Sequence, residues 1–504
     1  MLDDAKFEPH MTKTSLPNIA ATGIEGLDTF IGSGLPRDRI YLIEGDPGVG
    51  KTTLALQFLL EGVKNNEKVL LISLAENGDE LAAVAASHGW DMSAVDIFSL
   101  APDHFGGEEQ YSVMQPSEIE LSDTIQKIKD KVESLRPARV VIDSLSEVRL
   151  LAQNPLRYRR QILSLKHLFT GKSCTVLLLD DRTGESKDLT LQSLVHGVIE
   201  LQRHSPVYGK ARRKLQVVKL RGVDFQAGYH DFNIVKGGLE VYPRLVASHY
   251  RNGYTGGQVS SGSAELDQLL RGGIARGTTT LVLGPAGTGK SSLSAMYAVM
   301  AAERGEKAAI ISFDEGIDTL TARMTALNMS LDPHLKSGAI SIQQIDPAEM
   351  SPGEFMWRVK KIVEEQEVSV VVIDSLTGYL DAMPESQFLT IQMHEMLTYL
   401  NLQGVVTLLT MAQHGYIGSN MKNPADVSYL ADTVILLRYF EIRGEIKKAI
   451  SVVKMRSGPH ETTIREYRIG PERITVGNSL RDFHGILTGT PQYMGTPAAM
   501  MESE

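Results

Sequence analysis

One long segment of this sequence occurs twice. The stretch TGIEGLDTFIGSGLPRDRIYLIEGDPGVGKTT, residues 22–53, aligns without a gap with SGSAELDQLLRGGIARGTTTLVLGPAGTGKSS, residues 261–292, at an offset of 239 residues. Further matches follow in the same order, among them VLLISLAEN with AAIISFDEG and RVVIDSL with VVVIDSL. A period this long exceeds the roughly 20–50 residues of solenoid repeats, so the chain is a duplicated domain.

The duplication sets the expected domain boundaries. SHYRNGYTGG is polar, rich in glycine and without periodicity, which favours a linker over residues 248–260. We therefore predict an N-terminal domain over 15–247 and a C-terminal domain over 261–489. The segments 1–14 and 490–504 are predicted to be tails.

Composition narrows the class of protein that these domains can form. Hydrophobic residues make up 42% of the 504 residues and charged residues 22%, as in ordinary globular proteins. Cys174 is the only cysteine, which excludes an intramolecular disulfide framework. No apolar run approaches the roughly 18–20 residues of a membrane span, and the acidic start lacks the order of a signal peptide. We expect a soluble, cytoplasmic protein.

Within each copy, short apolar runs alternate with segments of helical spacing. YLIEG (41–45) and TLVLG (280–284) lead into glycine-rich loops, and residues 52–63 and 291–303 then carry apolar side chains at helical spacing. Strands that are apolar throughout and separated by helices indicate parallel strands covered on both faces. Each copy is predicted to be an α/β domain with a mostly parallel sheet flanked by helices.

The two loops fit the P-loop pattern G-x-x-x-x-G-K-[ST], as GDPGVGKT (45–52) and GPAGTGKS (284–291). In this pattern backbone N–H groups turn toward phosphates, and the helix N-terminus adds its positive end. Lys51 and Lys290 are expected to reach the β- and γ-phosphates. Two matches at equivalent places argue against a chance strand-to-helix turn. The predicted nucleotide-binding residues are Gly45, Asp46, Pro47, Gly48, Val49, Gly50, Lys51, Thr52, Thr53, Gly284, Pro285, Ala286, Gly287, Thr288, Gly289, Lys290, Ser291 and Ser292.

A second repeated feature is an apolar run that ends in aspartate. RVVID ends in Asp143 and VVVID ends in Asp374. Such a carboxylate, together with the hydroxyl of Thr52 or Ser291, is suited to hold Mg²⁺ at a nucleotide. An aspartate at a strand end also serves as a helix cap, but its recurrence after each P-loop favours the metal role.

A third feature is an acid at the end of the next strand, Glu76 in the first copy and Asp314 with Glu315 in the second. Hydrolysis, or attack by a protein hydroxyl, needs a group that orients the nucleophile and accepts its proton. The alternative is a solvated acid at a helix start, favoured there by the helix dipole. The shared offset of 239 residues favours the catalytic role.

Late in each copy, KLR and KMR place a lysine and an arginine on a strand, as Lys219 with Arg221 and Lys454 with Arg456. In a ring these cations are positioned to stabilise charge on a nucleotide held by a neighbouring subunit. Basic residues that protect an edge strand from pairing are the equally supported alternative.

These four features, in this order and duplicated, resemble the KaiC family, the double-domain RecA-like ATPases of the circadian clock. The resemblance covers roughly residues 15–490 and extends to SHGWDM (87–92) and ADTVILLRYFEIRGEIKKAISVVKMR (431–456). It implies two tandem RecA-like P-loop NTPase domains and a homohexameric, two-tiered ring with Mg·ATP at the subunit interfaces. In the family the N-terminal tier is a slow ATPase, and the C-terminal tier transfers the γ-phosphate to a neighbour's Ser-Thr pair and can reverse the transfer.

The resemblance also assigns roles to individual residues. Glu76 matches the catalytic acid of the N-terminal site, and Asp314 and Glu315 match the acids of the C-terminal site. The family's phosphoacceptor pair aligns with Ser428 and Tyr429, so a tyrosine stands where threonine is expected. The remaining matches are the metal-site residues Thr52, Asp143, Ser291 and Asp374, and the trans-acting residues Lys219, Arg221, Lys454 and Arg456.

Partners and function follow from the resemblance as expectations. The family's longer C-terminal tail receives KaiA, and the short tail here argues against KaiA binding, whereas a KaiB-like partner on the N-terminal ring remains compatible. We expect a homohexameric ATPase with Ser/Thr autokinase and autophosphatase activity, serving as an ATP-driven timing or stress-signalling switch. The alternative is a nucleotide-gated scaffold that hydrolyses ATP without autokinase activity.

A DNA-dependent motor of the RecA or helicase class is a third alternative. It requires a basic channel, for which RYRR (157–160) and KARRK (210–214) are the candidates. The net charge of −10 instead favours a solvated helix face and a hairpin or pore loop, so nucleic acid and membranes are not expected partners.

Overall fold

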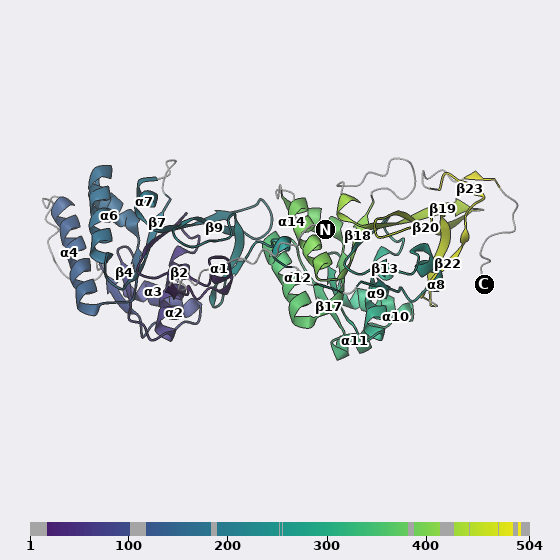
Figure 1. Ribbon diagram of the computed structural model, residues 1–504, viewed down its shortest axis with the longest axis horizontal. Coiled ribbons are helices and arrows are strands. Elements are labelled where there is room, and N and C mark those ends of the chain that lie inside the picture. The colour runs from purple at the N-terminus through teal and green to yellow at the C-terminus, as the bar shows by residue number, and fades with distance from the viewer. Residues whose placement is uncertain are drawn as a thin grey trace, which may run out of the picture. The chain divides into compact units, whose positions relative to one another are not determined.

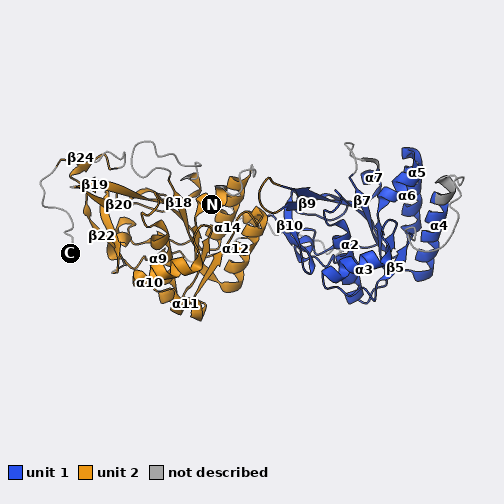
Figure 2. Ribbon diagram, turned by 180° about the vertical axis from the view of Figure 1, so that it is seen from behind, with its two compact units in different colours: residues 1–205, 211–244 blue, residues 206–210, 245–504 orange. Residues whose placement is uncertain are grey.

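The computed structural model describes residues 18–100, 117–182, 189–250, 253–254, 256–381, 388–413, 428–442, 444–471, 473–486 and 492–494. The chain divides into two compact units (Figure 2). Unit 1 comprises residues 1–205 and 211–244, and unit 2 comprises residues 206–210 and 245–504.

Unit 1 contains a nine-stranded sheet with the strand order β11-β10-β9-β8-β3-β7-β6-β4-β5. Strands β8, β3, β7, β6, β4 and β5 run parallel, and β9, β10 and β11 extend the sheet as antiparallel hairpins. The strands are β3 (Ile40–Gly45), β4 (Val69–Ser73), β5 (Asp96–Ser99), β6 (Arg139–Asp143), β7 (Thr175–Asp181), β8 (Gly197–His204), β9 (Arg212–Leu220), β10 (His230–Val235) and β11 (Gly238–Tyr242), with a separate pair β1 (Ile19–Ala20) and β2 (Leu35–Pro36).

Helices cover both faces of this sheet (Figure 1) because successive side chains of each strand enter opposite cores. In β3, Tyr41 and Ile43 pack with helices α1 to α3, whereas Ile40 and Leu42 pack with helices α4 to α7. The helices are α1 (Glu25–Phe30), α2 (Lys51–Lys64), α3 (Gly78–Ser87), α4 (Ser117–Leu135), α5 (Leu145–Ala152), α6 (Pro155–Phe169) and α7 (Leu189–Leu194).

Unit 2 repeats this topology with the order β16-β15-β17-β18-β14-β19-β20-β21-β22, again parallel from β16 to β19 and antiparallel from β19 to β22. The prediction of two tandem α/β domains with mostly parallel sheets is therefore confirmed. The strands are β14 (Thr279–Gly284), β15 (Lys307–Ser312), β16 (Ile340–Gln344), β17 (Val368–Asp374), β18 (Val406–Ala412), β19 (Thr433–Ile442), β20 (Glu445–Met455), β21 (Arg465–Gly470) and β22 (Arg473–Ser479), with the short pairs β12 (Gln258–Val259) and β13 (Ile274–Ala275), and β23 (Phe483–His484) and β24 (Gln492–Tyr493).

The helices of unit 2 also form two layers. One core joins the sheet to α8 to α11, and the other joins it to α12 to α14. These helices are α8 (Ala264–Leu269), α9 (Lys290–Glu303), α10 (Ile317–Ala326), α11 (Asp332–Ser337), α12 (Pro352–Gln366), α13 (Leu376–Asp381) and α14 (Leu389–Leu402), with the 3₁₀ turns η1 (Ala247–His249) and η2 (Ser428–Leu430).

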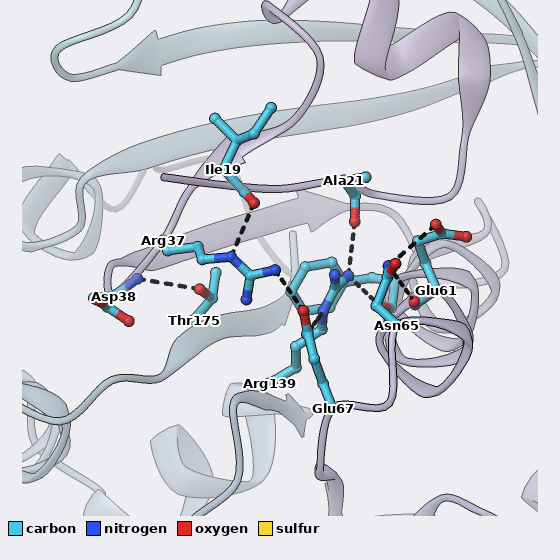
Figure 3. Close-up of polar contacts among 10 residues, drawn as sticks. Ile19, Ala21, Arg37, Asp38, Glu61, Asn65, Glu67, Arg139 and Thr175 are labelled. Carbon is cyan, nitrogen blue, oxygen red and sulfur yellow. Dashed lines mark hydrogen bonds and ion pairs between the residues drawn. The ribbon is translucent and has the colours of Figure 1, made fainter. Parts of the chain in front are cut away.

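A buried ionic cluster ties the elements of unit 1 together at the start of β6 (Figure 3). Arg139 is fully buried, and its Nε lies 2.6 Å from a carboxylate oxygen of Glu67. Its guanidinium also donates to the carbonyls of Ala21, at 2.7 Å, and Phe58, at 2.8 Å. Arg37 pairs with the other oxygen of Glu67. The sequence pattern does not indicate this cluster, because Arg139 is 72 residues from Glu67 and 118 residues from Ala21 along the chain.

Candidate functional site

The first P-loop connects β3 to α2 by a glycine-rich turn. Gly48 and Gly50 have φ values of +72° and +117°, in the left-handed region that glycine adopts without strain. A Cβ at Gly50 would also lie 2.8 Å from the Cδ1 atom of Ile234 on β10. The positive φ is what requires glycine at this position, since the Ile234 side chain can move aside, and α2 begins at Lys51 directly after the loop.

The ammonium group of Lys51 is held inside the P-loop. It donates to the carbonyls of Gly45, at 2.8 Å, and Asp46, at 3.0 Å. It also lies 2.6 Å from a carboxylate oxygen of Asp181, at the end of β7. Asp181 was not among the predicted site residues. The only signal in the sequence is the second acid that ends TVLLLDD, since the contact depends on the alignment of Gly45 with Asp181 across the sheet.

The predicted metal pair of unit 1 lies together. The Thr52 hydroxyl donates to Asp143 Oδ2 at 2.7 Å, which joins the start of α2 to the end of β6. Burial raises the pKa of Asp143, while the Thr52 hydrogen bond and the Lys51 charge act against this rise. A hydroxyl and a carboxylate are the oxygen donors that P-loop enzymes present to Mg²⁺, so these residues fit the predicted ion.

Glu76 follows β4 and is positioned by a tight turn. The Ser73 hydroxyl donates to the Glu76 carbonyl at 2.6 Å and accepts from the Glu76 N–H at 3.1 Å. Within the described part of the chain, the buried Oε2 atom of Glu76 has no hydrogen-bond partner. Burial, followed by the charges of Asp143 and Glu80, raises the pKa of the Glu76 carboxyl. A carboxylate that is both orphaned and raised in pKa is suited to accept a proton.

These groups line one cavity of about 360 Å³. The cavity brings the P-loop, the metal pair and Glu76 together, as the motif order predicts. It also adds side chains that the sequence did not indicate, among them Asp181 and Ser144. The lining residues are Pro47, Gly48, Gly50, Lys51, Thr52, Thr53, Ser73, Ala75, Glu76, Val84, Asp143, Ser144, Asp181 and Ile234.

The second P-loop has the same backbone plan between β14 and α9. Gly287 and Gly289 have φ values of +76° and +104°, and a Cβ at Gly289 would collide with Ile469. Lys290 Nζ donates to the Pro285 carbonyl at 2.9 Å. Burial lowers the pKa of the Lys290 ammonium, and the charge of Asp374 partly restores it.

The polar contacts of unit 2 differ from those of unit 1. Asp374, predicted to share a metal with Ser291, accepts a hydrogen bond from Thr410 on the neighbouring strand β18. The Ser375 hydroxyl donates to the carboxylate of Asp314, the first of the two predicted acids.

Glu315 is the structural counterpart of Glu76. The Ser312 hydroxyl donates to the Glu315 carbonyl at 2.7 Å, which repeats the turn at Ser73. Unlike Glu76, the Glu315 carboxylate forms an ion pair with Arg323 of α10 at 2.7 Å. Burial raises the pKa of the Glu315 carboxyl. The charge of Arg323 opposes this rise, and the charge of Asp374 adds to it.

The predicted trans-acting residues lie near the ends of β9 and β20. Lys219 and Lys454 are on these strands, and Arg221 and Arg456 follow directly after the strands end. Each lysine lies beside a register shift of its strand pair. Burial, ahead of the neighbouring arginine charge, lowers the pKa of both lysines.

Both lysines contact backbone within their own chain. Lys219 Nζ donates to the carbonyl of Gln192, and Lys454 Nζ donates to that of Ala431 at 2.7 Å. Neither Lys219 nor Arg221 lines the 360 Å³ cavity of unit 1. Arg456 lies 3.7 Å from a carboxylate oxygen of Asp432.

The predicted phosphoacceptors belong to η2, just before β19. Tyr429 is 48% exposed. The backbone of Ser428 opens the turn, and its side chain lies outside the described residues, as do most of the predicted tails.

The basic segments considered for DNA binding have ordinary positions in the fold. In α6, Tyr158 is buried, while Arg157, Arg159 and Arg160 are exposed, as on a solvated helix face. KARRK leads from the β8–β9 connection into β9.

Cys174 is buried, and burial raises the pKa of its thiol to about 12, as for a small core residue. Among the described residues, no helix is both long and apolar enough to cross a membrane.

Comparison with known proteins gives a family and named relatives. The family described as ATPase: KaiC matches residues 20–246 and 259–481. The "Circadian clock oscillator protein KaiC" of Parathermosynechococcus lividus is 28% identical over 481 residues, covering 93% of this chain and 87% of the relative. The protein of that name from Synechococcus elongatus is 27% identical, covering 93% and 91%. "Circadian clock protein KaiC3" of Synechocystis is also 27% identical, covering 94% of each chain.

Proposed function

The chain belongs to the KaiC family of ATPases, and from this premise we propose that it hydrolyses Mg·ATP at both P-loops. The observation that carries the proposal is the orphaned, buried Oε2 of Glu76, in the same cavity as Lys51 and the Thr52–Asp143 pair. A phosphate site, a metal-holding pair and an unpaired base within one cavity are the components that hydrolysis requires.

Each residue of the unit 1 nucleotide site has a distinct role in the proposed reaction. Lys51 and the loop N–H groups bind the β- and γ-phosphates, and Thr52 with Asp143 would hold Mg²⁺. The ion, when bound, neutralises charge that develops on the transferred phosphoryl group. Glu76 orients a water molecule for in-line attack and accepts its proton at the carboxylate.

Replacing Glu76 tests this assignment. In a chain whose second site is silenced by Lys290→Ala, Glu76→Gln is expected to lower the rate of phosphate release by about 10²-fold or more and to leave Mg·ATP binding intact. The matched control is Asp79→Asn on the exposed start of α3, because Asp79 is not among the charges that act on Glu76. Equal loss in both variants, or no loss in Glu76→Gln, would contradict the role of Glu76.

In unit 2 we propose autokinase and autophosphatase chemistry. Asp314 and Glu315 would activate the acceptor hydroxyl, and Ser428 of a neighbouring subunit is the proposed acceptor. Tyr429 is a weaker candidate, because a phenol extends farther than the β-hydroxyl of the threonine that the family carries, and in-line attack depends on position.

Phosphopeptide mass spectrometry of protein incubated with Mg·ATP tests this step on the tryptic segment 423–438. Phosphate on Ser428 that disappears in Glu315→Gln would support autokinase activity. An unmodified segment, with free phosphate accumulating, would instead support the nucleotide-gated scaffold, for which the tyrosine at position 429 is the favouring observation.

The proposed assembly is a homohexamer in which Lys219, Arg221, Lys454 and Arg456 act across subunit interfaces. The observation that supports this role is that neither Lys219 nor Arg221 lines the nucleotide cavity of its own unit. In this assembly the protein would serve as a timing or stress-signalling switch, with a KaiB-like protein as the proposed partner of the N-terminal ring.

A further inference from the structure

Asp181 places a negative charge inside the phosphate site of unit 1. Its Oδ1 atom lies 2.6 Å from Lys51 Nζ, and its Oδ2 atom accepts from the Ser146 hydroxyl at 3.2 Å. The lysine is 6% exposed and the aspartate side chain 25% exposed. With two loop carbonyls as the other acceptors, the ammonium group has three partners within the protein, as many as it has donors.

The second unit has no such charge at the equivalent position. In unit 1 the sheet register sets Gly45 opposite Asp181, and in unit 2 it sets Gly284 opposite Ala412. The carboxylate of unit 1 is thus replaced by a methyl group, although the two P-loops share the same backbone plan. The duplication therefore supplies an internal comparison at this position, aspartate in one unit and alanine in the other.

We propose that Asp181 is an internal counter-ion of Lys51 that competes with the nucleotide phosphates and so weakens the binding of Mg·ATP to unit 1. The inference rests on the proposed nucleotide site and goes beyond it, because it assigns to Asp181 a specific effect on the nucleotide affinity of unit 1. To pair with Lys51, a phosphate must displace the Asp181 carboxylate from the ammonium group. The phosphate then lies close to that carboxylate, which carries the same sign of charge. Both effects oppose binding, and they oppose it more strongly for a triphosphate than for a diphosphate, since the γ-phosphate lies nearest to Lys51.

The test is calorimetric titration of the full chain with Mg²⁺ and the non-hydrolysable ATP analogue AMPPNP, and with ADP. Unit 2 is silenced by Lys290→Ala, and Asp181 is changed to asparagine, which keeps its size and its capacity to accept from Ser146. We expect Asp181→Asn to tighten AMPPNP binding by about tenfold and ADP binding by clearly less. A merely structural role for Asp181 would change both affinities equally.

A reciprocal variant in unit 2 keeps the inference testable if Asp181→Asn fails to fold. With unit 1 silenced by Lys51→Ala, Ala412→Asp is expected to weaken AMPPNP binding to unit 2 by a similar factor. Unchanged or weaker AMPPNP binding in Asp181→Asn, or an unaffected Ala412→Asp chain, would overturn the inference. Failure of the parent chain to bind either nucleotide at unit 1 would instead overturn the proposed function.

Discussion

At the scale of single residues, Glu76 and Glu315 show how one position of a duplicated site acquires two environments. Both carboxyls follow the same serine turn, but Glu315 is paired with Arg323, whereas Glu76 Oε2 has no partner among the described residues. The pair at Glu315 fixes the carboxylate before a substrate arrives. The carboxylate at Glu76 remains available to a water molecule, which suits hydrolysis in unit 1.

The raised pKa of Glu76 predicts a pH dependence of hydrolysis in unit 1. A base must be deprotonated to accept a proton, so phosphate release should rise with pH and fall as Glu76 becomes protonated. Because burial and the charges of Asp143 and Glu80 raise the pKa of this carboxyl, the midpoint of kcat/KM should lie above the ordinary glutamate value of about 4.3.

The measurement is kcat/KM of the Lys290→Ala chain across pH. Removing the Glu80 charge by Glu80→Gln should move the midpoint to lower pH, because one of the charges that raises the Glu76 pKa is lost. A midpoint at or below the ordinary glutamate value, or one unmoved by Glu80→Gln, would contradict Glu76 as the titrating base.

Residue-scale prediction from sequence succeeds where a site is local in the chain. Lys51 and Thr52 are adjacent, and their pattern alone indicates phosphate binding. Asp181 lies far along the chain and reaches Lys51 only through strand register, which the pattern does not specify. The same limit applies to Thr410, which bonds to Asp374 from the neighbouring strand.

At the scale of elements, Arg139 at the start of β6 holds several segments of unit 1 together, since it contacts Glu67 and the carbonyls of Ala21 and Phe58. Arg139→Ala is expected to destabilise unit 1 by about 3–5 kcal/mol, because it leaves Glu67 with one cation and opens a cavity beside Phe58. Calorimetry of the full chain should show the transition of unit 1 falling by about 10 °C. The control is Lys68→Ala, an exposed residue beside Glu67, which should change little.

Unit 2 provides an internal comparison for this prediction. Arg276 and Glu306 repeat the outer pair at 2.5 Å, and Val370 stands at the strand position of Arg139. The transition of unit 2 should therefore not move in Arg139→Ala. Equal shifts of both transition temperatures, or no shift, would contradict a stabilising role of Arg139 specific to unit 1.

The same cluster predicts a loss of stability in acid. Burial alone would raise the pKa of Glu67, but the hydrogen bonds and charges of Arg139 and Arg37 outweigh it and lower the pKa below its ordinary value. A carboxyl whose pKa is lower in the folded state stabilises the fold above its unfolded pKa of about 4.3 and loses this contribution as pH falls through the folded pKa. The unit 1 transition temperature should fall over this range more steeply than in Glu67→Gln. Parallel pH profiles of the two chains would contradict the prediction.

Element-scale prediction from sequence was strongest for the parallel part of each sheet. Apolar runs such as those of β3 and β14 are buried on both faces, and their composition indicates this directly. The order of the strands and the antiparallel extension from β9 to β11 follow from pairing between distant segments, which no local pattern specifies. The duplication still predicted that both units would share whatever topology one of them adopted, and they do.

At the scale of the whole molecule, the position of Lys219 bears on whether this cation acts on the nucleotide of its own chain or on that of a neighbouring subunit. Lys219 belongs to unit 1 but does not line that unit's cavity, and its ammonium group donates to the carbonyl of Gln192. The neighbouring Val218 is 44% exposed at the register shift, which leaves an apolar surface beside the cation. In the proposed homohexamer, this part of β9 would lie at the interface with a neighbouring subunit. In a head-to-tail ring, each Lys219 would then serve the next subunit's nucleotide.

Co-expression of two inactive chains distinguishes action across an interface from action within a chain. With unit 2 silenced by Lys290→Ala, one chain carries Lys51→Ala and the other carries Lys219→Ala, and each alone should release little phosphate. If Lys219 acts in trans, mixed rings contain interfaces where an intact P-loop meets an intact Lys219. Random assortment of equal amounts makes these about a quarter of all interfaces, so about a quarter of the parent rate should return. Lys214→Ala, on the exposed far part of β9, should remain active by itself. Assemblies of six times the chain mass of 55.3 kDa that recover no activity would place Lys219 in the site of its own chain, or outside catalysis altogether.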